Sequence, residues 1–342
     1  MPRPQTLSII AVVTLLITLA TAHAAPAYKY LRTGAQQDRI TQPEAGYALM
    51  GGGQDLDEAF RFLCTRAHGG DFLILRATGK DDYNPYVAGL QDGKLCQLNS
   101  VATLILPTHE SASGPNAPFA AETIHHAEAI FIAGGDQSNY TRNWTNTPVQ
   151  LELNAAIARG VPIGGTSAGL AVLGEWAYSA EGDKPDDPNL DAKTALADPL
   201  GSRITLTHNF LNIPILKGII TDTHFTKRNR MGRLLVFLAN IQASGQTKDI
   251  HGLGIDQETA VLVDPDGQAR VVGRGAAYLV QPRDDIPVLT KGMPLDKAGY
   301  DMQKVSAGHE FNIKKWCCGS GPNVLVVERG VLRSRSDLGP VK

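Results

Sequence analysis

The chain has no marked excess of either charge: 32 Lys and Arg stand against 34 Asp and Glu, a formal net charge of −2. Such a balance gives no indication of a nucleic-acid partner or of an anionic membrane surface. Charged residues make up only 19% and aromatic residues 6% of the 342 residues, yet hydrophobic residues reach 43%. This composition excludes a disordered chain and indicates one large or two smaller globular domains.

Only one apolar run invites comparison with a membrane span. It extends from Leu7 to Ala20, behind Arg3, and is followed by Ala22-His23-Ala24. A short apolar run between a basic residue and a small-x-small tripeptide is typical of a secretory signal peptide, whereas a spanning helix needs about 20 residues. We expect residues 1–24 to be a signal cleaved after Ala24, leaving a periplasmic or extracellular protein without membrane contact. A retained anchor is the alternative.

Cysteine is scarce, and the spacing of the four cysteines fits no zinc site. In an exported protein they would meet an oxidising compartment, where four cysteines allow three pairings. We favour a disulfide between Cys64 and Cys96. The adjacent Cys317 and Cys318 could pair only through a strained ring.

Apolar strands alternate with helical stretches over the first half of the chain. GDFLILRATG (70–79) and SVATLILPT (100–108) are typical of buried strands, and PNAPFAAETIHHA (115–127) and PVQLELNAAIARG (148–160) of helices. This alternation predicts an α/β fold with a mostly parallel sheet and helices on both faces. Glycine turns follow three strands, at 51–53, 134–135 and 164–169, and sites gather at the carboxyl ends of such strands.

Other segments are interpreted as follows. Residues 28–43 look irregular, and the polar, Pro-rich stretch 181–199 is expected to be a surface loop. Residues 252–282 favour antiparallel strands, with Pro265-Asp266-Gly267 as a hairpin turn. We therefore predict a hydrolase-like domain over 25–263 and a β-rich C-terminal extension over 264–342 packed on it.

The pentapeptide GTSAG places Ser167 in a G-x-S-x-G pattern between Gly165 and Gly169. A serine in a strand-turn-helix elbow projects its hydroxyl above the sheet, and the flanking glycines let the chain turn sharply. The next amide, that of Ala168, would then point to an oxyanion position. The pattern predicts a nucleophile, and a purely structural tight turn is the alternative.

A serine nucleophile needs a base, and His224 lies in TDTHF, where a strand is expected to end and a helix to begin. We expect it at the same sheet edge as Ser167, with a capping or buried histidine as the alternative. Four cations, Lys227, Arg228, Arg230 and Arg233, fall on the first two turns of the expected helix, where they oppose its dipole. They indicate a site for a carboxylate-bearing substrate, unless they form a solvated basic face.

Five motifs together resemble the cyanophycinases and the related serine peptidases of the dipeptidase E type: GGG at 51–53, GGDQ at 134–137, GGTSAG at 164–169, DTHFTKRNRMGRLL at 222–235 and GLGIDQETA at 252–260. The resemblance implies a class I glutamine amidotransferase-like fold and hydrolysis of peptide bonds that involve aspartate. Cyanophycinases act on cyanophycin, a poly-aspartate with arginine on each side chain, and release β-aspartyl-arginine. The resemblance also makes a homodimer the expected assembly.

The resemblance carries roles to individual residues. Ser167 matches the nucleophile and His224 the general base, while Gly135 and Asp136 would form the oxyanion loop together with Ala168. The positions that match substrate-binding residues are Gln137, Asp222, Thr223, Arg228, Arg230 and Arg233.

Two positions depart from the family pattern. Where the family usually has a glutamate that orients the histidine, this chain has Gln257, between Asp256 and Glu258. A glutamine can accept a hydrogen bond from the ring but cannot stabilise an imidazolium with a full charge. Either Glu258 or Asp256 takes the place of that glutamate, or Glu181 contacts the histidine from elsewhere in the chain, or turnover is slow. At Thr223 many cyanophycinases have glutamine, which changes the expected recognition of the arginine branch.

The sequence thus predicts an exported serine-type exopeptidase that cleaves aspartyl peptide bonds in cyanophycin or β-aspartyl peptides, with Ser167, His224, Gln257 and Glu258 as catalytic residues. No metal or organic cofactor is predicted. Two alternatives remain: a secreted α/β-hydrolase-like esterase, and a catalytically weakened binding protein on the same scaffold.

Overall fold

The computed structural model describes residues 27–91, 96–184, 186–247, 249–283, 288–316 and 323–334. The expected signal peptide, residues 1–24, and the pair Cys317 and Cys318 lie outside these residues. Within the described ranges, no helix combines the length and the apolar character that crossing a bilayer requires.

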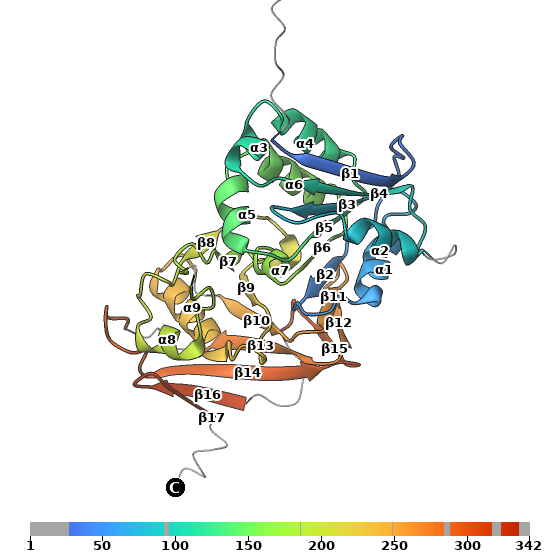
Figure 1. Ribbon diagram of the computed structural model, residues 1–342. Coiled ribbons are helices and arrows are strands. Elements are labelled where there is room, and N and C mark those ends of the chain that lie inside the picture. The colour runs from blue at the N-terminus through green and yellow to red at the C-terminus, as the bar shows by residue number, and fades with distance from the viewer. Residues whose placement is uncertain are drawn as a thin grey trace, which may run out of the picture.

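The described strands form two sheets (Figure 1). In the first sheet, β4, β3, β5, β6 and β2 run parallel to one another, and the outer strands pair antiparallel. Its order is β1 (Lys29–Gly34), β4 (Ser100–Ile105), β3 (Asp71–Arg76), β5 (Ala129–Ile132), β6 (Ile163–Thr166), β2 (Tyr47–Met50), β11 (Thr259–Val263), β12 (Gln268–Gly273) and β15 (Glu310–Asn312).

Helices cover both faces of the parallel part, because successive strand side chains point to opposite faces. In β3, Phe72 and Ile74 pack with the helix α1 (Asp57–Arg66) and the neighbouring α2 (Tyr83–Gly89). Leu73 and Leu75 pack on the other side with α3 (His109–Ser113), α4 (Ala117–His125), α5 (Gln137–Trp144) and α6 (Pro148–Ala158). The expected α/β fold is confirmed.

The second sheet is mainly antiparallel, although β9 runs parallel to both β10 and β7. Its order is β17 (Val331–Ser334), β16 (Asn323–Glu328), β14 (Ala298–Ser306), β13 (Ala276–Pro282), β10 (His251–Ile255), β9 (Ile219–Asp222), β7 (Trp176–Tyr178) and β8 (Leu206–His208). The long helix α9 (Met231–Ala243) buries Leu234 and Leu238 in one apolar cluster with Tyr278 of this sheet. The remaining helical elements are α7 (Ala168–Ala171), α8 (Ala192–Ala197) and a 3₁₀ turn (Pro214–Leu216).

The C-terminal part is rich in strands, as expected, and these strands complete both sheets. β12 follows β11 through the predicted hairpin turn, in which the amide of Gly267 donates to the carbonyl of Asp264 (2.9 Å). β12 and β15 extend the first sheet, and β13, β14, β16 and β17 belong to the second. Hydrogen bonds therefore run across residue 263, and the division of the chain at that residue stays a prediction.

Two segments are more regular than expected. Residues 28–43 were expected to be irregular, but Lys29–Gly34 form the edge strand β1, which pairs antiparallel with β4. The segment 181–199, expected to be a loop, contains α8, whose N-cap Asp191 accepts a hydrogen bond from the amide of Thr194 (2.7 Å). The predicted disulfide between Cys64 and Cys96 is confirmed.

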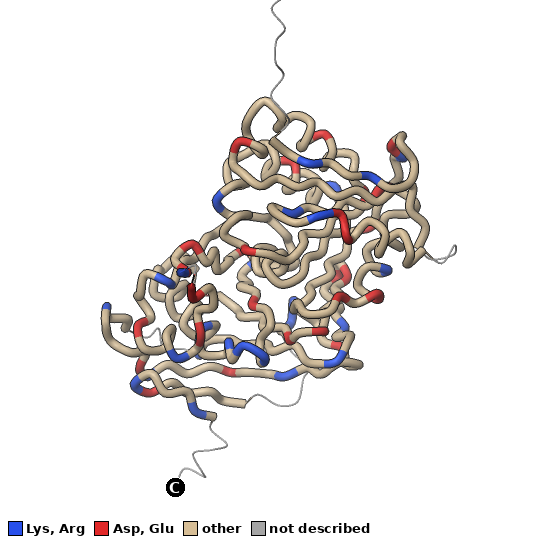
Figure 2. Tube along the Cα trace, in the orientation of Figure 1, with Lys and Arg blue, Asp and Glu red and all other residues tan. Residues whose placement is uncertain are grey.

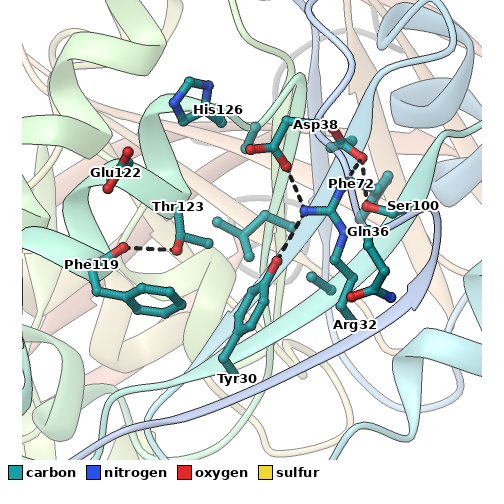
Figure 3. Close-up of a pocket in the computed structure, with 14 residues that line it drawn as sticks. Tyr30, Arg32, Gln36, Asp38, Phe72, Ser100, Phe119, Glu122, Thr123 and His126 are labelled. Carbon is teal, nitrogen blue, oxygen red and sulfur yellow. Dashed lines mark hydrogen bonds and ion pairs between the residues drawn. The ribbon is translucent and has the colours of Figure 1, made fainter.

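A pocket of about 200 Å³ lies at the edge of the first sheet, between β1 and α4 (Figure 3). Arg32 points into it and donates hydrogen bonds to Tyr30 (3.3 Å), Asp38 (2.5 Å) and Asp71 (3.1 Å), so that its charge is already compensated. The contact with Asp71 links β1 to β3, and the pocket is lined by residues other than the predicted site residues. In Figure 2, acidic and basic residues are interspersed along the described chain.

Candidate active site

Ser167 stands in a sharp turn between β6 and α7. Its backbone has φ +51° and ψ −116°, a region that residues with a Cβ rarely adopt. The two flanking glycines are required by space: a Cβ on Gly165 would lie 2.7 Å from the carbonyl carbon of Gly169, and a Cβ on Gly169 would lie 2.0 Å from the carbonyl oxygen of Ile132. The strand-turn-helix elbow predicted from GTSAG is therefore present.

His224 follows β9, which lies in the second sheet, whereas Ser167 follows β6 in the first. The expectation that both follow strands of one sheet was wrong. The glycine turn after β2 brings them together, because the amide of His224 donates to the carbonyl of Gly51 (2.7 Å) and Gly52 packs against the imidazole. As a result, Ser167 Oγ lies 2.7 Å from His224 Nε2, within hydrogen-bond reach for proton transfer.

Gln257 occupies the third position of this chain of contacts. Its Nε2 lies 2.6 Å from His224 Nδ1. A nitrogen that donates to Nδ1 leaves the ring proton on Nε2, facing Ser167, and that tautomer cannot accept the serine proton. Only when the amide turns its oxygen toward the ring does Nδ1 carry the proton and Nε2 become the base.

The carboxylates weighed as substitutes for a glutamate at 257 are engaged elsewhere. Glu258 forms an ion pair with Arg274 (3.3 Å). Asp256 accepts hydrogen bonds from the amide (3.0 Å) and hydroxyl (2.6 Å) of Thr226 and so fixes the turn after His224. Glu181 accepts from the hydroxyl of Thr141 (3.0 Å). Among the described residues, the structure therefore brings Gln257, and none of these three carboxylates, into hydrogen-bond contact with the ring.

The predicted oxyanion residues lie beside the nucleophile. Gly135, Asp136 and Ala168 line the same cleft as Ser167. Asp136 caps α5 by accepting a hydrogen bond from the amide of Ser138 (2.9 Å), which holds the glycine turn against the helix. The first amides of a helix have no partner within it, and α7 begins directly after Ser167. Oxyanion binding by these amides stays a prediction.

A cleft of about 700 Å³ opens in front of Ser167. Its wall carries both charges. The predicted residues Gln137, Thr223, Arg228, Arg230 and Arg233 line it, together with residues that the sequence did not single out: Ser138, Arg142, Tyr178, Ala180, Asp183, Lys184, Pro188 and Asn189. Four of the latter, Asp183, Lys184, Pro188 and Asn189, belong to segment 181–199, whose polar, Pro-rich composition indicated only a surface loop.

The basic residues after His224 occupy other positions than expected. The helix α9 begins at Met231, so Lys227 and Arg228 precede it, and Arg230 is its N-cap. Arg233 is buried and makes a bidentate pair with the equally buried Asp222, in which Nε donates to Oδ2 (2.8 Å). Arg230 is also buried and hydrogen-bonded within the protein. Of the three arginines in this segment that line the cleft, Arg228 is exposed, whereas Arg230 and Arg233 are buried.

The protonation of His224 follows from this environment. Burial, together with the charges of Arg228 and Arg230, lowers the pKa of its imidazole to about 4. A general base acts in its neutral form, so activity is lost only as the pH falls through this pKa. We expect kcat/KM to stay level from about pH 8 down to about pH 5 and to decline near pH 4. A pH series of kcat/KM measures this, and an acid limb near pH 6.5 would contradict it.

Gly52 is expected to tolerate no side chain. Its φ is +92°, and a Cβ there would lie 2.4 Å from His224 Cε1. Gly52→Ala should displace the imidazole and reduce kcat by about 10²-fold, because a shift of about 1 Å in a reacting group can have that effect. Gly245→Ala is the matched control: it has φ +72° and no atom within 4 Å of the added Cβ. Equal kcat values for both variants would show that His224 does not depend on this contact.

Comparison with known proteins agrees with the motifs. The model of peptidase family S51 matches residues 77–271. A cyanophycinase of Synechococcus elongatus is 38% identical over 162 residues, which are 47% of this chain and 44% of that protein. A cyanophycinase of Trichormus variabilis is 28% identical over 198 residues, 56% of this chain and 59% of that protein. The chain thus matches about half the length of these relatives.

Among solved structures, a peptidase from an acI-B1 actinobacterium superimposes with a TM-score of 0.51. The match covers 79% of this chain and 98% of that one at 18% sequence identity. At this identity the likeness concerns the fold. It supports the arrangement of parallel strands and helices around the serine turn.

Proposed function

Because this chain belongs to peptidase family S51, we propose that it is an exported serine-type exopeptidase that hydrolyses aspartyl peptide bonds, in cyanophycin or in β-aspartyl peptides. The observation that carries this proposal is the 2.7 Å contact between Ser167 Oγ and His224 Nε2, with Ser167 in the lining of a large cleft. The matched cyanophycinases suggest the substrate class. A homodimer stays a prediction of the same resemblance.

The proposed reaction has two halves. Ser167 Oγ attacks the amide carbonyl while His224 Nε2 takes its proton, and the amides of the Gly135 turn and of Ala168 hold the oxyanion. His224 then returns the proton to the leaving amine, which departs as the acyl-enzyme forms. Water hydrolyses the ester, with His224 again acting as base, and restores Ser167.

Arg228 is the group proposed to bind a substrate carboxylate. It is exposed and lines the cleft, and its guanidinium matches the geometry of a carboxylate. The wider set of arginines was expected to share this role, but Arg233 already holds Asp222. A substrate aspartyl group therefore meets one exposed guanidinium from this segment, and Arg142, which is also exposed and lines the cleft, adds a second.

Export is supported by two features. The apolar run 7–20 has the form of a signal peptide, and a disulfide such as that between Cys64 and Cys96 persists in oxidising compartments. Expression of the full chain in a bacterial host, followed by N-terminal sequencing of the periplasmic fraction, should give a protein that begins at Ala25. A product that retains residues 1–24 would contradict the proposal.

The activity itself is tested with purified cyanophycin. Release of β-aspartyl-arginine by the native protein, and none by Ser167→Ala, would support the proposal. If no dipeptide is released but a fluorophosphonate labels Ser167, the nucleophile stands and the substrate is another aspartyl peptide or an ester. The absence of both would favour a binding protein, an alternative for which Gln257 next to His224 is the specific observation.

A further inference from the structure

Arg230 lines the cleft, but its guanidinium is hydrogen-bonded to other residues of the protein. Its Nη1 donates to the carbonyl oxygen and to the hydroxyl of Thr223 (both 3.0 Å). Its Nη2 (2.8 Å) and Nε (3.3 Å) donate to Oδ1 of Asn189. Only 6% of the residue is exposed. A guanidinium that is buried and bonded on both sides has little capacity left for a substrate carboxylate.

These contacts join two segments that both line the cleft. Thr223 is the residue directly before His224, whose backbone has φ +45°. Asn189 lines the cleft together with several residues that precede it in the chain, among them Ala180 and Asp183. The neighbouring Arg233 supports the same segment, because its Nη1 donates to the carbonyl of Leu190 (3.2 Å). Asn189, which lines the cleft, and the next residue, Leu190, are thus tied through Arg230 and Arg233 to Thr223 and Asp222, the two residues directly before His224.

We propose that Arg230 and Asn189 are positioning residues: they clamp the cleft wall to the His224 turn and thereby hold the imidazole in line with Ser167. This inference rests on the proposed function and departs from the substrate-binding role that the resemblance implies for Arg230. The carboxylate contact falls to Arg228 instead. The clamp acts before substrate arrives, so its loss should show in reactions that involve no substrate carboxylate.

The rate of Ser167 labelling by a small neutral fluorophosphonate measures the Ser–His pair without that carboxylate. Asn189→Ala and Arg230→Lys should each slow labelling about tenfold, since a displaced reacting group is costly. The double variant should be labelled no more slowly than the slower of the two single variants, because both substitutions remove the same contact between Arg230 and Asn189. Asn189→Asp keeps an acceptor oxygen for Arg230 and should label at close to the native rate. Asp186→Ala, an exposed change on the same segment, is the matched control.

If both Asn189→Ala and Arg230→Lys are labelled at the native rate, the clamp is overturned. Arg230 would then be a substrate ligand, and Arg230→Lys should raise the KM for the aspartyl peptide. Equal slowing by Asn189→Asp and Asn189→Ala would overturn it as well. Hydrogen exchange provides a second readout that requires no activity: Asn189→Ala should speed exchange in peptides covering both 186–191 and 222–228. Faster exchange in the first peptide alone would contradict the clamp. A native protein that is not labelled would contradict the proposed function, and exchange would still decide on the clamp.

Discussion

Gln257→Glu is expected to raise kcat for aspartyl peptide hydrolysis by between about 10² and 10⁴-fold at pH 8, because the reverse exchange at the orienting acid of a serine protease reduces kcat by about 10⁴. The side chain at 257 already lies 2.6 Å from His224 Nδ1. A carboxylate presents only acceptors, so it fixes the proton on Nδ1 and leaves Nε2 free to take the proton of Ser167. It also stabilises the imidazolium formed in the transition state, which a neutral amide does not.

The gain in kcat from Gln257→Glu should depend on pH. The native imidazole has a pKa of about 4, and a carboxylate beside the ring raises that pKa because it favours the charged form. The base must be neutral, so the acid limb of kcat/KM should move to higher pH in Gln257→Glu, and the advantage should shrink between about pH 7 and pH 5. Steady-state kinetics across this range measure both effects.

Glu258→Gln is the matched control, because Glu258 pairs with Arg274 rather than with His224. Its kcat should equal that of the native protein. A Gln257→Glu variant that is no faster at pH 8 would mean that the glutamine carbonyl already orients the ring, or that His224 is not the base. An unchanged acid limb would favour the second explanation.

Much of the fold was predictable because its central strands are short apolar runs bounded by glycine. Phe72 to Leu75 are all buried, and so are all four residues of β5. Such runs occur where helices cover both faces of a sheet. The edge strand β1 gave no comparable signal, since all six of its residues are at least partly exposed. Pairing with β4, a tertiary contact, makes it a strand.

The candidate site was predictable in its residues but not in its contacts. The motifs identified Ser167, His224 and Gln257, yet no spacing indicates that Gly51 and Gly52 bridge two sheets to join them. The positive φ values of His224 and Asn229 delay the start of α9 to Met231. The sequence pattern placed the four cations on the first two turns of the helix, because the helix was expected to begin directly after His224. The turn before Met231 therefore decides that Arg228 is exposed while Arg230 is buried.

Ser167→Gly is expected to abolish hydrolysis and, at the same time, to make the protein more stable. Loss of a serine nucleophile costs about 10⁶ in kcat. The backbone at 167, with φ +51° and ψ −116°, is that of a position in a type II′ turn that glycine adopts readily. Strain of about 1–3 kcal/mol in a residue with a Cβ would be relieved, offset by about 0.5–1 kcal/mol for the greater freedom of glycine in the unfolded chain.

The net gain of about 1 kcal/mol should raise the thermal unfolding temperature by roughly 2 °C in a chain of this size. Ser167→Ala separates the two effects, because it removes the hydroxyl but keeps the Cβ: it should be as inactive as Ser167→Gly without the gain in stability. Measurement of dipeptide release and of unfolding temperature for both variants decides between the explanations. Equal unfolding temperatures would show that the turn holds no strain at Ser167, and dipeptide release by either variant would exclude Ser167 as the nucleophile. If both variants are inactive and only Ser167→Gly is more stable, the backbone at Ser167 is strained, and this strain is the cost of presenting the hydroxyl to His224.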